Sequence, residues 1–148
     1  MLKIRVQEED FDAGAELAEL AEDAVGGIAS FTGIVRGNTA QNLASLYIEH
    51  YPGMTEQAMR EIAGQAMDRW PLIRCTIIHR VGKLLPRQNI VFTAASSPHR
   101  EAALCATAFL IDWLKTSAPL WKREEFTSGE SAWVAARASD DEAASRWG

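Results

Sequence analysis

Cysteine and histidine are scarce in this sequence, and their placement argues against a metal centre. The chain of 148 residues holds two cysteines and three histidines. Neither Cys75 nor Cys105 belongs to a Cys-x-x-Cys motif or a Cys/His ligand cluster. Both are expected to be buried free thiols, which suits a reducing compartment such as the cytoplasm. His50 and His79 lie in strand patterns and are expected to be structural. No metal and no cofactor is expected.

Long apolar runs and an excess of basic residues are also absent. No run reaches the roughly 18 apolar residues that a membrane span requires. The N-terminal "MLKIRVQEEDF" turns acidic too early for a signal peptide. The net charge is -5 and the sequence pI about 5.2, whereas general nucleic-acid binding calls for a basic face. We therefore expect a cytoplasmic protein that binds neither membranes nor nucleic acid, with room for a local basic pocket.

The sequence does have enough apolar material for one core. Hydrophobic residues make up 47% of the chain, which includes five tryptophans. A chain of this length fits one domain, and such a domain buries roughly two-thirds of its unfolded surface. We expect a single domain over residues 1–148. Four tryptophans are expected in its core or at an interface: Trp70, Trp113, Trp133 and Trp147.

The order of hydrophobic patterns predicts an α+β domain with a largely antiparallel or mixed sheet. Alternating or β-branched segments predict strands at 2–7, 26–36, 44–51, 73–82, 89–96 and 131–137. Helical spacing and start signals predict helices at 13–23, 52–70 and 98–115, and a final turn or two at 140–147. A loop is expected at 37–42 and a turn at 83–88. Asp12 is expected to cap the first helix, Pro71 to end the second, Pro98 to open the third, and Gly33 to mark a bend or bulge.

The first candidate site is the helix start in "SSPHRE". Ser97 can cap the helix, and His99 and Arg100 fall in its first turn. Free backbone N–H groups and the positive end of the helix dipole attract anions there. Arginine adds a bidentate donor for phosphate or carboxylate. The alternative is a surface helix start with two solvated side chains, where Glu101 compensates the dipole.

The second candidate is the lysine pair in "DWLKTSAPLWKRE". Lys115 stands at a helix C-terminus, where the dipole already favours a cation. Lys122 is harder to explain structurally, because it follows Trp121 in a segment tethered by Pro119. Neighbouring lysines lower each other's pKa, and burial lowers it further. Such a lysine can transfer a proton or act as a covalent nucleophile. The alternative is an ordinary solvated helix end.

A third candidate is the arginine in "FTGIVRGN". Arg36 lies between Gly33 and Gly37, at the expected end of a strand. Glycines beside an arginine allow close approach of an anionic ligand. They suit a plain turn equally well.

These stretches together resemble a known family. "FTGIVRG", "IEHYPGMTEQA", "RWPLIRCTIIHRVGKLLPRQNIVFTAASSPHREAA" and "DWLKTSAPLWKRE" are similar to the large, catalytic subunit of molybdopterin synthase, the MoaE family. The motifs occur in the family's order, and the likeness runs from the first strand to the terminal "SRW". The resemblance implies an α/β hammerhead domain with a smaller antiparallel β subdomain.

The resemblance also implies a reaction and its partners. Two sulfurs would be inserted into cyclic pyranopterin monophosphate, which makes the dithiolene of molybdopterin. The sulfur would arrive as a thiocarboxylate on the C-terminal glycine of a small ubiquitin-like subunit of the MoaD family. That tail would enter a pocket of the large subunit. Two large subunits would form a central homodimer with one small subunit at each end, a heterotetramer.

Site residues follow from the same resemblance. Lys115 and Lys122 match the family's catalytic lysines, and His99 and Arg100 match a substrate-binding pair contributed across the dimer. The implied binding positions are Ile34, Val35, Arg36, His99, Arg100, Arg123 and Glu124. Some relatives carry lysine where this chain has Ile34, which leaves a backbone contact at that position.

Two other classes of function stay open on the sequence. One is a non-catalytic module that binds anions without the small subunit. The other is a structural dimerisation protein whose lysines are only solvated.

Overall fold

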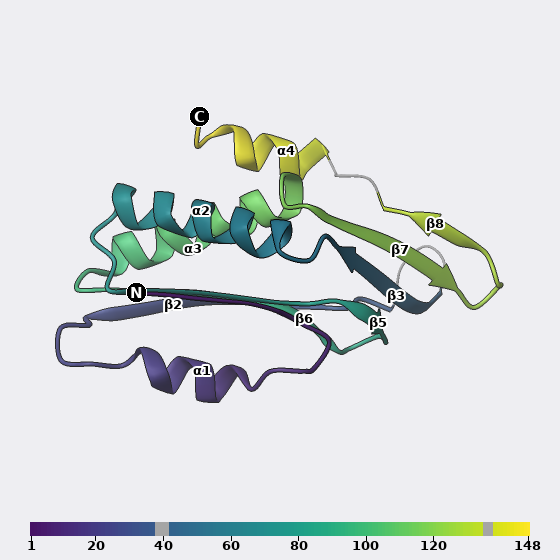
Figure 1. Ribbon diagram of the computed structural model, residues 1–148, viewed down its shortest axis with the longest axis horizontal. Coiled ribbons are helices and arrows are strands. Elements are labelled where there is room, and N and C mark those ends of the chain that lie inside the picture. The colour runs from purple at the N-terminus through teal and green to yellow at the C-terminus, as the bar shows by residue number, and fades with distance from the viewer. Residues whose placement is uncertain (38–41, 135–137) are drawn as a thin grey trace.

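A computed structural model describes residues 1–37, 42–134 and 138–148, and it places their strands in two four-stranded sheets (Figure 1). The first sheet has the order β1 (Leu2–Gln7), β4 (Arg74–Arg80), β6 (Asn89–Ser97) and β2 (Gly27–Ile34). Its β1–β4 pair is parallel, and its other pairs are antiparallel. The second sheet has the order β5 (Gly82–Leu84), β3 (Leu43–His50), β7 (Leu120–Phe126) and β8 (Ser131–Trp133), with antiparallel pairs. The predicted α+β class is confirmed.

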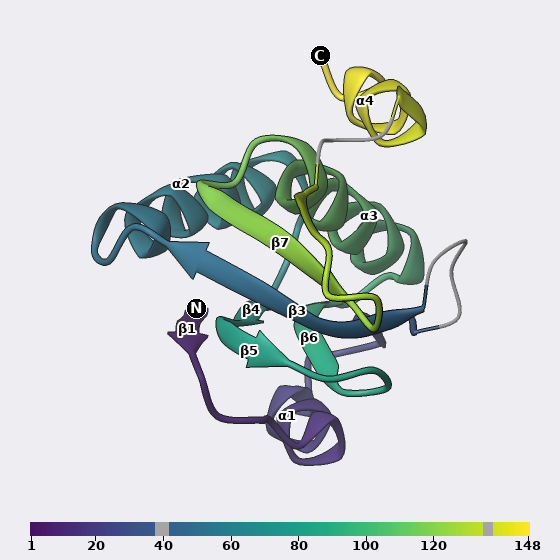
Figure 2. The same cartoon turned by 90° about the vertical axis from the view of Figure 1, so that its right-hand side faces the viewer.

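Helices cover both faces of the first sheet. Figure 1 shows α1 (Ala13–Leu20) on one face, and α2 (Met54–Arg69) and α3 (Arg100–Thr116) together on the other. A further helix, α4 (Ala138–Ser145), packs against α3 (Figure 2). None of the helices within the described ranges has the length and apolar character that crossing a membrane demands.

The main core joins the two sheets. Alternate residues of β4 and β6 point to opposite faces, so Ile78 and Phe92 pack towards α1 while Ile77 and Val91 pack towards α2 and α3. The second group continues without a break onto the other sheet through Leu46, Ile48 and Leu84. Fully burying one such aliphatic side chain contributes roughly 1.5–3 kcal/mol. This shared core fixes the second sheet relative to α3.

A glycine makes the corner between the sheets. The single strand predicted at 73–82 divides into β4 and β5, so the predicted turn at 83–88 overlaps a strand. Gly82, at the corner, has φ of +84°. Glycine adopts this left-handed conformation readily, whereas a residue with a Cβ atom adopts it only with steric strain. The chain thereby passes from the first sheet to the second within two residues.

Two sequence predictions about local geometry are confirmed. Asp12 caps α1, because its carboxylate accepts a hydrogen bond of 3.1 Å from the backbone N–H of Ala15. The β2–β6 register shifts between Gly33 and Ile34, as expected for a bulge. Helix α1 ends at Leu20, three residues earlier than predicted.

The predicted start of α3 is wrong. The helix begins at Arg100, with His99 as its extended N-cap residue, and not at Pro98. Ser97 is the last residue of β6, and its hydroxyl accepts from the His99 N–H at 3.1 Å. The same hydroxyl donates to the Pro71 carbonyl at 2.9 Å. These bonds fix the bend between β6 and the helix, so that α3 begins only after His99.

One strand was not predicted. The segment "LWKREEF" forms β7, which pairs with β3 from Leu43 to His50. Its consecutive charges hide the alternation that marks a strand, and pairing with β3 decides its conformation. The short strand predicted at 131–137 is confirmed as β8. The last part of that predicted range, 135–137, lies outside the described residues. The same holds for 38–41 of the predicted loop.

The cysteines and tryptophans only partly follow prediction. Both cysteines are free thiols, with Cys75 buried and Cys105 partly exposed. Trp70, Trp113 and Trp147 pack against the main core. Trp133 is 57% exposed and is therefore not a core residue.

Candidate functional site

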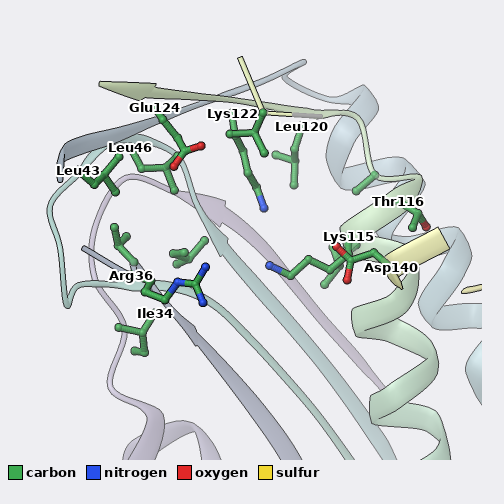
Figure 3. A pocket seen from close by; sticks show the side chains of 15 residues that line it. Ile34, Arg36, Leu43, Leu46, Lys115, Thr116, Leu120, Lys122, Glu124 and Asp140 are labelled. Atoms are coloured by element: carbon green, nitrogen blue, oxygen red, sulfur yellow. The ribbon is translucent and has the colours of Figure 1, made fainter. Parts of the chain in front are cut away.

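A pocket of about 480 Å³ opens where α3 ends and β7 begins (Figure 3). Its walls come from the end of β2, from β3, α3 and β7, and from α4. The lining residues are Ile34, Val35, Arg36, Leu43, Leu46, Ile90, Leu114, Lys115, Thr116, Ala118, Leu120, Lys122, Glu124, Val134 and Asp140. The pocket thus has an aliphatic floor with charged groups above it.

The turn after α3 brings the two lysines together. Helix α3 closes at Ser117, whose N–H donates to the Trp113 carbonyl at 2.8 Å. The next turn is tied to α2, because the Thr55 hydroxyl donates to the Pro119 carbonyl at 2.9 Å. Strand β7 then runs back along β3. In Figure 3, Lys115 reaches into the pocket from the helix and Lys122 from the strand.

The environment of Lys122 makes its ammonium group unusually acidic. Burial, and then the positive charge of Lys115, lower the pKa of Lys122 to about 8. Asp140 acts in the opposite sense and raises that pKa. Among the described residues, the Lys122 ammonium has no ion-pair or hydrogen-bond partner, although the Lys122 carbonyl accepts from the Val134 N–H at 2.8 Å. Near neutral pH it can therefore give up or take up a proton.

Arg36 supplies a third positive charge. It follows the end of β2, and Figure 3 shows its guanidinium pointing into the pocket. The neighbouring Val35 is buried, and its backbone is fixed by hydrogen bonds of 2.9 Å to Gln88 and 2.8 Å from Arg87. Ile34 is half exposed at the rim. Val35 thus anchors the wall, and Arg36 presents the charge.

Strand alternation separates the predicted pair Arg123 and Glu124. Glu124 lies on the same face of β7 as Lys122 and lines the pocket. Arg123 lies on the opposite face, between the rings of Tyr47 and Trp133 at 5.2 and 5.6 Å. The structure therefore brings Glu124 into the site and leaves Arg123 outside it.

His99 and Arg100 lie far from the lysines of the same chain. They stand at the start of α3, and Lys115 stands near its end. Sixteen residues of α-helix span about 24 Å. Both side chains are exposed. One chain cannot bring this pair into the lysine pocket.

Two groups near the lysines were missed by sequence reasoning. Asp140 enters the pocket wall from α4, and no motif links it to a lysine 18 residues earlier. His79 is buried on β4, facing the main core beside Ile77. Burial, and then the charge of Lys122, lower the pKa of His79 to about 3. With this lowered pKa His79 is neutral near pH 7, and its Nδ1–H donates to the Arg80 carbonyl at 2.7 Å.

Comparison with known proteins agrees with this architecture. The family described as "MoaE protein" matches residues 6–117. A "Molybdopterin synthase catalytic subunit" of Escherichia coli is 49% identical over 98% of this chain and 97% of that protein. Another so named, from Ralstonia nicotianae, is 48% identical over 100% of this chain and 85% of its own length. The solved "Molybdopterin biosynthesis MoaE protein from Burkholderia ambifaria" is 46% identical, with a TM-score of 0.84 over 99% of this chain and 98% of that one.

This chain belongs to the MoaE family. The family match runs from the end of β1 through the whole of α3, and the full-length relatives extend it through β7, β8 and α4.

Neutral buried His79 should make the protein sensitive to acid. An unfolded histidine titrates near 6.5, so between that pH and about 3 the unfolded chain binds a proton that the folded chain does not. The free energy of unfolding that neutral His79 contributes is fully present above pH 6.5, and it is lost as the pH falls towards 3. From pH 7 to pH 5 this one group should remove about 2 kcal/mol.

Urea unfolding at the two pH values measures the effect. His79→Gln should lose less stability than the wild type over this interval. His50→Gln, at a partly exposed histidine, is the matched control and should behave like the wild type. Equal losses in all three proteins would contradict the assignment.

Proposed function

We propose that this chain is the catalytic subunit of a molybdopterin synthase, with Lys115 and Lys122 as its catalytic residues. It would transfer sulfur from the C-terminal thiocarboxylate of a small ubiquitin-like subunit to cyclic pyranopterin monophosphate, which forms the dithiolene of molybdopterin. The observation that carries the proposal is the convergence of both lysines in one pocket, from a helix and from a strand. The names of the similar proteins support the same activity.

The two lysines suit different parts of this chemistry. Lys122, with its pKa lowered to about 8, is the group for proton transfer or covalent attack. Lys115 and Arg36 are cations aimed at the same space, and they stabilise negative charge on tetrahedral intermediates. The same three cations attract an anionic thiocarboxylate tail, and the aliphatic floor accommodates its backbone.

The sulfur has to come from a partner. Burial raises the pKa of the Cys75 thiol to about 12, so this cysteine does not form the thiolate that sulfur transfer needs. Cys105 lies on α3 outside the pocket lining. A small subunit that brings its own sulfur on a flexible tail fits an open pocket. Two free thiols suit the cytoplasm as the place of this reaction.

The phosphate of the substrate would be held by a second copy of this chain. His99 and Arg100 lie about 24 Å along α3 from Lys115, so they join a lysine pocket only if another copy supplies them. In such a dimer the second copy would lie against β2, at the edge of the first sheet. This strand exposes Ile28 and Phe31 by more than a third of their surface. The active assembly would then be a homodimer with one small subunit on each copy.

Reconstitution tests the function directly. Purified protein, a thiocarboxylated small subunit and the cyclic precursor should yield molybdopterin. Lys115→Ala and Lys122→Ala should each abolish most of this activity. Lys115→Ala should leave the fold intact, since a helix-end lysine contributes only about 0.3–1 kcal/mol through the dipole. Arginine at position 122 should rescue poorly, because it keeps the charge but cannot release a proton.

Exposed Lys83 on β5 is the matched control, and Lys83→Ala should keep full activity. Full activity of Lys122→Arg would reduce this lysine to an electrostatic role. A folded wild type that binds the precursor but yields no product would point to an anion-binding module.

The shared site makes a separate prediction. Arg100→Ala should weaken precursor binding by about 1.5–3 kcal/mol, the usual loss for one charge-assisted hydrogen bond. Homodimers of Arg100→Ala and of Lys115→Ala should both be poorly active. Mixing them under subunit exchange should restore activity, because half of the sites in a heterodimer receive both intact residues.

Subunit exchange can be followed with a tag on one variant. Mixed dimers without any gain in activity would show that each site uses residues of one chain only.

A further inference from the structure

The spacing of Asp112 and Lys115 on α3 should produce an ion pair, and none forms. The two residues are three positions apart, so their side chains share one face of the helix. Within the described residues, however, the Lys115 ammonium takes part in no ion pair and projects into the pocket (Figure 3). Something else must hold the Asp112 carboxylate.

The end of the chain holds it. Arg146 donates to Oδ2 of Asp112 at 2.8 Å, and the indole N–H of Trp147 donates to the same oxygen at 2.7 Å. The Asp112 side chain is only 14% exposed, and both donors meet the same carboxylate oxygen. Because this carboxylate already accepts a charge-assisted bond and an indole bond, it attracts the neighbouring Lys115 ammonium less strongly.

Trp147 is held firmly in its position beside Asp112 by contacts with α2 and α3. The Trp147 ring packs edge-on against Trp70 and Phe109, each at 5.6 Å between centroids. The Arg69 guanidinium lies 5.6 Å from the Trp147 ring and donates to the Trp147 carbonyl at 3.1 Å. Both α2 and α3 therefore hold this segment, and Figure 2 shows α4 lying beside α3.

We propose that Arg146 and Trp147 are positioning residues for Lys115, because they engage the Asp112 carboxylate and so leave the Lys115 ammonium free for the pocket. Neither touches the pocket. Without them, Asp112 would turn to its neighbour one helical turn away and draw the ammonium back along the helix. This inference rests on the proposed catalytic role of Lys115.

A second-site rescue tests it. The double variant Arg146→Ala/Trp147→Phe removes both donors and keeps an aromatic ring in place. Its turnover in the reconstituted synthase should fall by about two- to fivefold, the range expected when a surface ion pair withholds the lysine. Adding Asp112→Asn should restore turnover, since a neutral amide cannot capture an ammonium. A purely structural role for the segment would give no such rescue.

Two controls belong to the experiment. Arg60→Gln removes an exposed arginine whose side chain makes no hydrogen bond or ion pair in the described part of the chain, and it should leave turnover unchanged. Asp112→Asn alone should stay near wild type, because its amide oxygen still accepts from Trp147. Thermal unfolding of every variant shows that the fold persists.

The outcomes separate the two claims. The positioning role would be overturned if the double variant kept full turnover, or if Asp112→Asn did not restore the turnover that the double variant loses. In either case an active wild type would still uphold the proposed function. An inactive wild type, or a fully active Lys115→Ala, would overturn the proposed function and this inference with it.

Discussion

The close approach of two like charges in a partly buried pocket is the constraint on which the rest of this structure depends. Lys115 and Lys122 repel each other, and burial makes a charged Lys122 less favourable still. Such a pair persists only if the elements that carry it cannot move apart. The common core of the two sheets, the Gly82 corner and the bond between Thr55 and Pro119 supply that rigidity. The destabilised ammonium is then available for chemistry.

Much of the fold could be predicted because its signals are local. The Asp12 cap and the bulge after Gly33 depend on residues a few positions away. Strand β7 could not be predicted in this way, because "LWKREEF" becomes a strand only by pairing with β3. Once β7 is known to be a strand, alternation alone places Glu124 in the pocket and Arg123 outside it.

The site was predictable in part. The two lysines and Arg36 stand in short stretches whose likeness to a family is visible in the sequence, and they do meet in one pocket. Asp140 and the Asp112–Trp147 contact are different, because they bring together residues 18 and 35 positions apart in the chain. No local pattern encodes such contacts. The proposed substrate-binding role of His99 and Arg100 also requires a second copy of the chain, which no local pattern can indicate.

The pKa of Lys122 tests this account most directly. It can be measured by pH-dependent amine labelling with mass spectrometry, with exposed Lys83 as the reference for labelling. The account predicts a midpoint of about 8 for Lys122 in the wild type. Lys115→Ala should raise this midpoint, because a repelling charge is removed, and Asp140→Asn should lower it, because an attracting charge is removed. A Lys122 midpoint near the ordinary value of 10.5, unchanged in both variants, would contradict the claim that the lysines act on each other in one pocket.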